Sequence, residues 1–334
     1  MSSVMSMQTY SAILAGFGSQ LPERRLTNDD LSNMVETNDE WITQRTGIKE
    51  RRIAAESDTT ASLATAAAKK AIASANLEPS DIELIVCATI TPEMVFPSTA
   101  CFVGAALGLG GVPAFDLSAA CSGFIYALVT GANFVRAGQF KNVLVIGAET
   151  LSRITDYTDR SSCILFGDGA GAVVLQRSTD PARGLIYSSL HADGTGADAM
   201  KCIPGSRFPL SSTMIEGRQH FMKIKGREVY KFAVTKFEEL IHEAMRACEL
   251  APQDLKLIIP HQVNQRIIDS AMEKLGLPAE KAFVNIDRYG NTSAASIPIA
   301  LDEAQRSGRI KKGDVVIFVA FGGGLTWANA VARI

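Results

Sequence analysis

The chain has 334 residues, 47% of them hydrophobic and 20% charged, and its formal net charge is −2 at pH 7. This length allows two domains or two halves of one large domain, and the near-neutral charge argues against nucleic acid as a partner. No apolar run is long enough to span a membrane, so we expect no membrane partner. The six cysteines show no CxxC pair and no metal-ligand spacing, which predicts reduced thiols in a cytoplasmic protein without a metal site.

In chain order, the sequence predicts alternating strands and helices after a loose, disordered leader over residues 1–9. The expected strands cover residues 11–17, 82–90, 112–115, 142–148, 171–176 and 255–259, and the expected long helices cover 59–75 and 228–248. Residues 191–222 show no clear period and are expected to form a long functional loop. Near-continuous apolar strands that alternate with helices predict helix-covered, mainly parallel sheets in an α/β protein.

Cys121 follows the expected strand at 112–115 and precedes a segment of helix-compatible composition that starts at Phe124. A cysteine at such a turn lies near a helix N-terminus, where the partial positive charge stabilises a thiolate. Its neighbours on both sides are small, so a substrate can approach the sulfur closely. The stretch therefore predicts a nucleophile. The alternative is that Cys121 is a small buried core residue, the usual place of a free cysteine.

An internal repeat indicates that the chain consists of two related halves. Residues 75–85 (ANLEPSDIELI) are echoed by residues 248–258 (CELAPQDLKLI), and the expected strand at 142–146 is echoed at 314–318. A shorter match aligns SAAC, ending at Cys121, with SAAS, ending at Ser296. Because the period is domain-sized, the repeat indicates a duplicated α/β unit and not a solenoid.

The repeat predicts both the organisation of the chain and the composition of its site. We expect an N-terminal half over 10–180 that carries the nucleophile, a connecting, substrate-tunnel segment over 181–226, and a C-terminal half over 227–334. The second half offers His261 after its strand at 255–259 and Asn291 just before its own small-residue helix. If a pseudo-twofold axis relates the halves, these strand ends converge and bring Cys121, His261 and Asn291 together.

Seven motifs, taken jointly, resemble those of the β-ketoacyl-acyl-carrier-protein synthase III family. They are DEWI (39–42), RTGI (45–48), AACSG (119–123), FGDGAGA (166–172), HQVN (261–264), GNTSA (290–294) and FGGGLTW (321–327). The resemblance covers nearly the whole chain from about residue 10. It implies a thiolase-type fold, in which duplicated α/β halves form five layers (αβαβα) with mixed, mostly parallel sheets, and it implies a homodimer.

The resemblance also implies a decarboxylative Claisen condensation that initiates type II fatty-acid synthesis. An acyl-CoA primer acylates Cys121, malonyl-acyl carrier protein loses CO₂, and the carbanion attacks the acyl-enzyme. The backbone amides of Cys121 and Gly323 would form the oxyanion hole of acyl transfer. His261 and Asn291 would donate hydrogen bonds to the enolate oxygen that decarboxylation creates. No cofactor is implied, since acyl-CoA is a substrate.

Three further sets of residues match family positions for substrate and partner binding. The residues expected to bind CoA are Trp41, Arg45, Arg160, Gly226 and Asn264. The residues expected to line the acyl pocket are Ile90, Phe96, Leu151, Phe166, Leu210 and Phe321. The residues expected to dock the carrier protein are Lys231, Arg266 and Lys274. Glu273 stands where a second lysine is expected, which predicts a weaker or differently placed carrier contact. The alternatives are that Trp41 is a packing residue, that Arg45 is a solvated charge, and that the three basic residues form a solvated helix face.

Two other functions stay open at this point, and one is excluded. A related acyl-condensing or acyl-transferring enzyme of secondary metabolism fits the same motifs, because the sequence does not give the depth of the acyl pocket. A non-catalytic acyl-CoA-binding relative is disfavoured, since the cysteine, histidine and asparagine are all present. A nucleotide-binding dehydrogenase is excluded because no GxGxxG motif lies between a strand and a helix.

Overall fold

Two mixed β-sheets form the framework of the computed structural model, which describes residues 10–334. The leader predicted over residues 1–9 lies outside the described residues. Across the first sheet the strands are β1 (Ser11–Gln20), β7 (Gly169–Ser178), β6 (Asn142–Glu149), β4 (Leu84–Ala88) and β5 (Ala114–Leu117). Across the second they are β11 (Leu255–Pro260), β12 (Val315–Gly322), β13 (Thr326–Arg333) and β8 (Gly184–Ala192).

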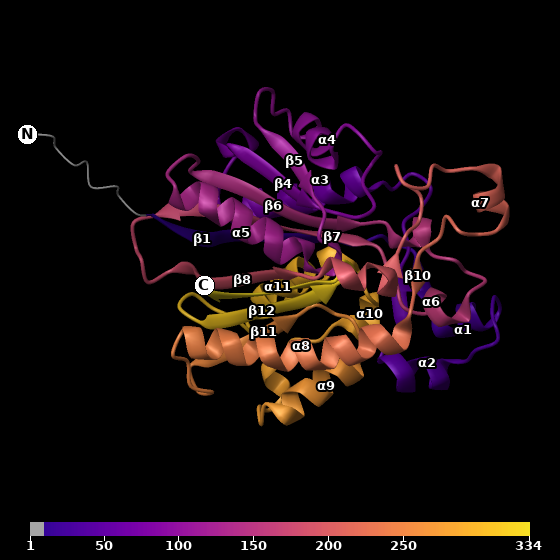
Figure 1. Ribbon diagram of the computed structural model, residues 1–334. Helices are drawn as coiled ribbons and strands as arrows, with labels where there is room; N and C mark the ends of the chain where they lie inside the picture. Colours follow the sequence, from indigo (N-terminus) through magenta and orange to yellow (C-terminus); the bar gives the residue numbers. More distant parts are fainter. Residues whose placement is uncertain (1–9) are drawn as a thin grey trace, which may run out of the picture.

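Helices cover both sheets and separate them, which gives the five layers that the resemblance implies (Figure 1). The outer face of the first sheet carries α3 (Thr60–Ser74) and α4 (Thr99–Ala106), at the top of Figure 1. Between the sheets lie α5 (Gly123–Arg136) and α11 (Ser296–Arg306). The outer face of the second sheet carries α8 (Gly226–Ala247) and α9 (Gln265–Lys274), at the bottom. Among the described residues, no helix is both long and apolar enough to cross a membrane.

The central strands β6, β7 and β12 are largely apolar on both faces because helices cover both faces. In β6, Val143 and Val145 pack into the core between the sheets, whereas Leu144 and Ile146 pack beneath α3 and α4. The expectation of mostly parallel sheets is wrong in detail, because the described strands of the two sheets make four antiparallel pairs and three parallel ones. A continuous apolar run indicates only that a strand is buried on both faces, and it does not indicate the direction of the neighbouring strands. β7 is buried on both faces although both of its neighbours are antiparallel to it.

The backbone confirms the repeat and corrects one of its alignments. Asn76 and Glu249, which follow α3 and α8, both have positive φ, and so do Ala120 and Ser293, which precede α5 and α11. The members of each pair are 173 positions apart. Cys121 therefore corresponds to Ala294 in the second half, and not to Ser296 as the SAAC and SAAS match suggests. A run of small residues can slip by two positions without losing its resemblance.

The segment that follows β7 is more than a connection between the halves. Its strand β8 pairs with β13 and completes the second sheet, just as β1 pairs with β7 in the first. We therefore propose that the second half begins at β8, and not at residue 227.

After β8 comes an excursion, residues 193–222, that holds β9 (Met200–Lys201) and α7 (Ser212–Glu216) before β10 (Lys223–Ile224). Figure 1 shows α7 projecting from the side of the layers, on the same side of the molecule as the short helices α1 (Asn28–Ser32), α2 (Asp39–Thr46) and α6 (Arg160–Cys163). Two remaining strands, β2 (Arg25–Thr27) and β3 (Glu50–Arg52), pair with each other, and α10 (Ile286–Tyr289) contacts β3.

Candidate active site

Cys121 lies in the 3₁₀ turn Ala120–Ser122 that joins β5 to α5, and its side chain is buried. The preceding Ala120 has a φ of 46°, a left-handed conformation that costs a non-glycine residue energy and turns the chain sharply. The end of β12 packs directly against this turn: a Cβ on Gly322 would lie 2.6 Å from the backbone nitrogen of Cys121. Glycine is therefore required at position 322, and the second half forms one wall around the thiol.

The electrostatic setting of Cys121 differs from the sequence-based expectation. Burial raises the pKa of the Cys121 thiol to about 12, a change that the Ser293 hydroxyl partly offsets and the Glu149 carboxylate reinforces. The expected lowering by a helix N-terminus does not prevail, because α5 begins only at Gly123 and the sulfur is removed from water. The thiol, and not the thiolate, is therefore the dominant form at neutral pH.

His261 follows β11 as a buried, neutral imidazole. Its backbone N–H donates to the carbonyl of Val319 at 2.8 Å, and burial lowers the pKa of the ring to about 3. Its Nδ1 lies 2.7 Å from the hydroxyl oxygen of Ser296. Its Nε2 is buried and has no hydrogen-bond partner among residues 10–334. The ring of Phe321 stands edge-on to the imidazole, with 6.0 Å between centroids. One ring nitrogen is thus held and the other is left for a substrate.

Asn291 is fixed by its backbone and by its side-chain oxygen. Its N–H donates to the carbonyl of Leu165 at 2.8 Å, and its carbonyl accepts the N–H of Gly167 at 3.0 Å. Its Oδ1 accepts the N–H of Ser293 at 2.9 Å. Because the side-chain oxygen is occupied, the Nδ2 amide group is the part of Asn291 that remains to donate to a substrate.

Ser293 connects the three predicted residues, although we expected no role for it. Its hydroxyl lowers the pKa of the nearby Cys121 thiol but is buried without a hydrogen-bond partner among residues 10–334. Its N–H donates to Oδ1 of Asn291, and its carbonyl oxygen lies 2.8 Å from the hydroxyl oxygen of Ser296, which contacts Nδ1 of His261. The structure thus gathers the cysteine, the histidine and the asparagine around one turn. The signal in the sequence is that Ser293 lies within the GNTSA motif, next to the small residues of the turn.

Glu149 is a second residue that the sequence reasoning missed. It ends β6, is fully buried, and accepts hydrogen bonds from the hydroxyls of Thr89 and Thr91 at 3.2 and 2.6 Å and from the backbone amides of Ile90 and Thr91. Burial raises its pKa to about 7. The available signal was a lone carboxylate at the end of an otherwise apolar strand. Its bonds hold the segment 89–91 beside the thiol.

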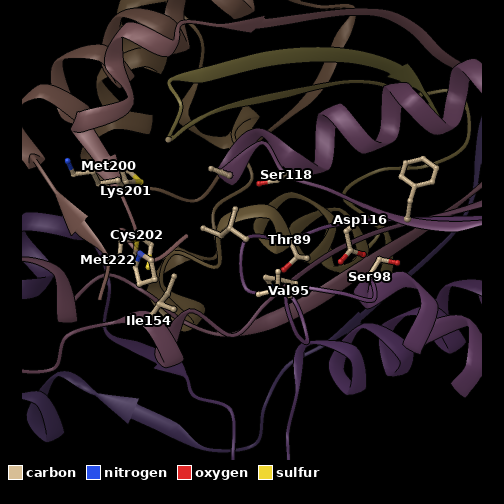
Figure 2. A pocket seen from close by; sticks show the side chains of 16 residues that line it. Thr89, Val95, Ser98, Asp116, Ser118, Ile154, Met200, Lys201, Cys202 and Met222 are labelled. Carbon is tan, nitrogen blue, oxygen red and sulfur yellow. The ribbon is translucent and has the colours of Figure 1, made fainter. Parts of the chain in front are cut away.

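A cavity of about 770 Å³ opens next to Cys121, with Ala120 and Gly323 in its wall. Figure 2 shows that two parts of the chain enclose it, with Met200 and Met222 on one side and Thr89 on the other. The predominantly apolar lining suits an acyl chain, and its position next to the turn that carries Cys121 suits a thioester carbonyl.

Three of the residues predicted for the acyl pocket lie together. Ile90 lines the cavity. Leu151 and Phe166 pack with Ile90 and Met222 in one buried cluster, and therefore support the wall from behind.

The other three predicted pocket residues lie elsewhere. Phe321 contacts His261. Phe96 is 82% exposed, beside Val95, which lines the cavity. Leu210 is 59% exposed on the excursion and does not line this cavity, contrary to expectation. The excursion has no period from which its course can be predicted, which explains the error.

Two of the residues predicted for CoA, Arg45 and Arg160, lie around the ring of Trp41. The guanidinium carbons of Arg160 and Arg45 lie 4.8 and 5.7 Å from the ring centroid. Asn264 caps α9 and donates to the backbone carbonyl of Arg45 at 3.0 Å, which connects this group to the HQVN motif. Gly226 begins α8, and no atom outside its own chain neighbours lies within 4 Å of where a Cβ would be. The structure thus places Gly226 beside open space.

The three predicted docking residues lie on α8 and α9, which pack against each other. Lys231 on α8 and Arg266 and Lys274 on α9 are all exposed. The Lys274 ammonium is 3.5 Å from the Glu238 carboxylate, so part of its charge is compensated within the chain.

Among residues 10–334, no cluster of three or more histidine, cysteine, aspartate or glutamate side chains could hold a metal ion.

Comparisons with known proteins agree on one family. Residues 115–194 match the family model for 3-oxoacyl-[acyl-carrier-protein] synthase III, and residues 245–334 match the model for its C-terminal part. A β-ketoacyl-acyl-carrier-protein synthase III from Caldanaerobacter subterraneus is 52% identical over 97% of this chain and 98% of that protein. One from Aquifex aeolicus is 50% identical over 96% and 98%.

Solved structures lead to the same result. The crystal structure of 3-oxoacyl-acyl-carrier-protein synthase III from Aquifex aeolicus has a TM-score of 0.90 at 49% identity and covers 97% of this chain and 100% of its own. The priming β-ketosynthase of a polyketide biosynthetic pathway has a TM-score of 0.92 at 32% identity and covers 100% and 99%. The chain has the thiolase-type fold of these enzymes, and it belongs to the β-ketoacyl-acyl-carrier-protein synthase III family of condensing acyltransferases.

Proposed function

We propose that the chain condenses a short acyl-CoA primer with malonyl-acyl carrier protein, releases CO₂, and forms the β-ketoacyl-acyl carrier protein that begins fatty-acid synthesis. The observation that carries this proposal is the turn at Ser293, which binds Asn291, contacts the Ser296 hydroxyl next to His261, and packs against the turn of Cys121 beside an acyl-sized cavity. Names of relatives that are about half identical over nearly the full chain support it.

In the first step, the sulfur of Cys121 attacks the carbonyl carbon of the acyl-CoA. The bond between that carbon and the CoA sulfur breaks, and the proton of the Cys121 thiol leaves with CoA as its thiol. The backbone amides of Cys121 and Gly323 are the donors for the tetrahedral oxyanion. Because burial raises the pKa of Cys121 to about 12, the loss of its proton is coupled to the arrival of the thioester.

In the second step, the bond between the malonyl methylene and its carboxylate breaks and CO₂ leaves. The electron pair passes to the thioester oxygen as an enolate, to which Nε2 of His261 and Nδ2 of Asn291 donate. The carbanion then attacks the acyl carbon on Cys121, and the sulfur leaves as a thiolate that takes up a proton. A neutral histidine suits this role, because burial keeps its pKa near 3 and it does not carry a charge of its own into the site.

The group around Trp41 is proposed to bind the nucleotide end of CoA. An adenine ring stacks on the indole, Arg160 flanks it, and Arg45 meets phosphate. The pantetheine passes Gly226 and Asn264 toward Cys121. The exposed basic residues of α8 and α9 are the proposed contact for the acidic carrier protein.

We also propose that the chain is a cytoplasmic homodimer. Val95 and Phe96 are 98% and 82% exposed, an unusual position for two neighbouring apolar side chains, and Val95 lines the cavity. A second copy of the chain that covers this loop would bring Phe96 toward a cavity. Light scattering should give twice the monomer mass of 35.7 kDa. A purely monomeric protein would contradict the dimer.

Separate assays of the two half-reactions test the proposed function. His261→Ala and Asn291→Ala are expected to form acyl-enzyme at a rate close to wild type while they lose CO₂ release from malonyl-acyl carrier protein by about 10² or more. Tyr126→Phe is a control, because its hydroxyl bonds to the His191 carbonyl outside this network. Equal loss of both half-reactions in the Asn291 variant would contradict this assignment of roles. A wild-type protein without CO₂ release would contradict the function.

The reading as an enzyme of secondary metabolism is not favoured. The polyketide priming enzyme is 32% identical, whereas the relatives named synthase III reach about 50%. Turnover with short primers and a fatty-acid carrier protein would agree with this ranking.

A further inference from the structure

Ser296 places its hydroxyl between His261 and the turn that carries Ser293. It is the first residue of α11 and is buried. Its Oγ lies 2.7 Å from Nδ1 of His261 and 2.8 Å from the carbonyl oxygen of Ser293. None of the roles assigned above involves Ser296, and its apparent match to Cys121 is an error of alignment.

The distribution of protons in this small network is constrained. The hydroxyl of Ser296 carries one proton, which it can donate either to Nδ1 of His261 or to the carbonyl of Ser293. That carbonyl also accepts the backbone N–H of Ser296, so it keeps a partner when the hydroxyl turns away. Nδ1 makes no other hydrogen bond among residues 10–334. The hydroxyl is thus the one group of the described chain that can determine which ring nitrogen of His261 carries the proton.

We propose that Ser296 is a positioning residue that donates its hydroxyl proton to Nδ1 and thereby holds His261 in the tautomer protonated at Nε2. This inference rests on the proposed function, because an enolate oxygen accepts hydrogen bonds only and requires a donor at Nε2. Nε2 is buried without a partner, and a donor kept there in advance needs no rearrangement when charge develops.

The effect of Ser296 is confined to one step of the reaction. Decarboxylation depends on the Nε2–H donor, whereas acylation depends on the oxyanion amides and on Cys121. Without the hydroxyl, Nδ1 becomes a buried nitrogen with no partner, and the ring can protonate on either nitrogen or rotate. The loss should therefore appear in CO₂ release and leave acyl transfer nearly unchanged.

The test combines one spectroscopic and two kinetic measurements on the full-length protein. Long-range ¹H–¹⁵N spectra of protein labelled at its four histidines, with His261 assigned by its absence in His261→Ala, report the tautomer directly. Wild type is expected to show the proton on Nε2. Ser296→Ala is expected to show a mixture or the other tautomer, with CO₂ release at least about tenfold slower and acylation within about twofold of wild type. Ser296→Thr keeps the hydroxyl and should restore the Nε2–H signal and CO₂ release.

Matched controls separate this effect from a loss of folding. Thr65→Val removes another buried hydroxyl, which bonds the carbonyl of Ala61 inside α3, away from the site, and should change neither half-reaction. A wild-type spectrum with the proton on Nδ1 would overturn the proposal even if Ser296→Ala did not fold. Unchanged CO₂ release in a folded Ser296→Ala, or equal loss of both half-reactions, would also overturn it. A wild-type protein that shows Nε2–H but releases no CO₂ would refute the proposed function, and the tautomer assignment would stand.

Discussion

The protonation state of Cys121 gives the sharpest quantitative prediction. With its pKa raised to about 12, about one molecule in 10⁵ carries the thiolate at pH 7, compared with about one in 10² for a thiol at the ordinary value of 9.0. Because the thiolate is the nucleophile, alkylation of Cys121 by iodoacetamide should be slow at pH 7 and rise about tenfold for each pH unit up to pH 9.

The assay follows the peptide that contains Cys121 by mass spectrometry between pH 7 and 9, with the exposed Cys101 as an internal check that the reagent is active. Glu149→Gln supplies the matched perturbation. The Glu149 carboxylate raises the pKa of Cys121, so its neutralisation should speed alkylation at pH 8. A rate that levels off below pH 8 would show a thiolate already formed, as a dominant helix N-terminus requires, and would refute the reasoning from burial.

Three further predictions concern stability and substrate binding. Gly147→Ala would place a Cβ 2.2 Å from the carbonyl oxygen of Ala294, so denaturant unfolding should show that the free energy of unfolding falls by about 3 kcal/mol or more. The control Gly110→Ala, whose Cβ would meet no atom within 4 Å, should be nearly neutral. A small effect of Gly147→Ala would contradict the packing of the two halves. Burial raises the folded-state pKa of Glu149 from 4.5 to about 7, so its contribution to the free energy of unfolding is complete below pH 4.5 and is lost as the pH rises through 7. Relative to Glu149→Gln, wild type should therefore lose up to about 3 kcal/mol of stability across this pH range. Parallel pH profiles of stability for the two proteins would contradict this prediction. Trp41→Ala should raise the KM for acyl-CoA about tenfold with little change in kcat. The KM for an acyl-pantetheine thioester, which lacks the nucleotide, should not change. Equal effects on both substrates would indicate that Trp41 has a packing role.

The fold and the proximity of Cys121, His261 and Asn291 were predictable because their signals are local. Apolar strands followed by small residues or by a polar side chain mark the strand ends where Cys121 and His261 lie, whereas Asn291 follows the short helix α10 and is marked by the small residues after it. The repeat then shows that the two sets of strand ends belong to related halves. The parallel or antiparallel pairing of β7 was not predictable, because burial on both faces gives the same apolar pattern in either direction.

The remaining features depend on contacts between distant parts of the chain. The pKa of Cys121 is raised by burial, to which the close packing of Gly322 from the other half contributes, and is partly lowered again by Ser293; the sequence around the cysteine contains neither residue. The bond between His261 and Ser296 spans 35 positions, and the apparent register of the repeat assigns Ser296 to a different place. Such contacts follow from the geometry of the two halves and not from any local pattern.

The most direct test of the account is the intact mass of the protein after incubation with short, branched and long acyl-CoAs. We expect one acyl adduct per chain with a short primer, its loss in Cys121→Ala, and its retention in Cys202→Ala, which removes the other thiol at the cavity. An adduct that persists in Cys121→Ala, or no adduct with any acyl-CoA, would contradict the assignment of Cys121 as the nucleophile. Adducts with long or aromatic acyl groups alone would contradict a role in starting fatty-acid chains.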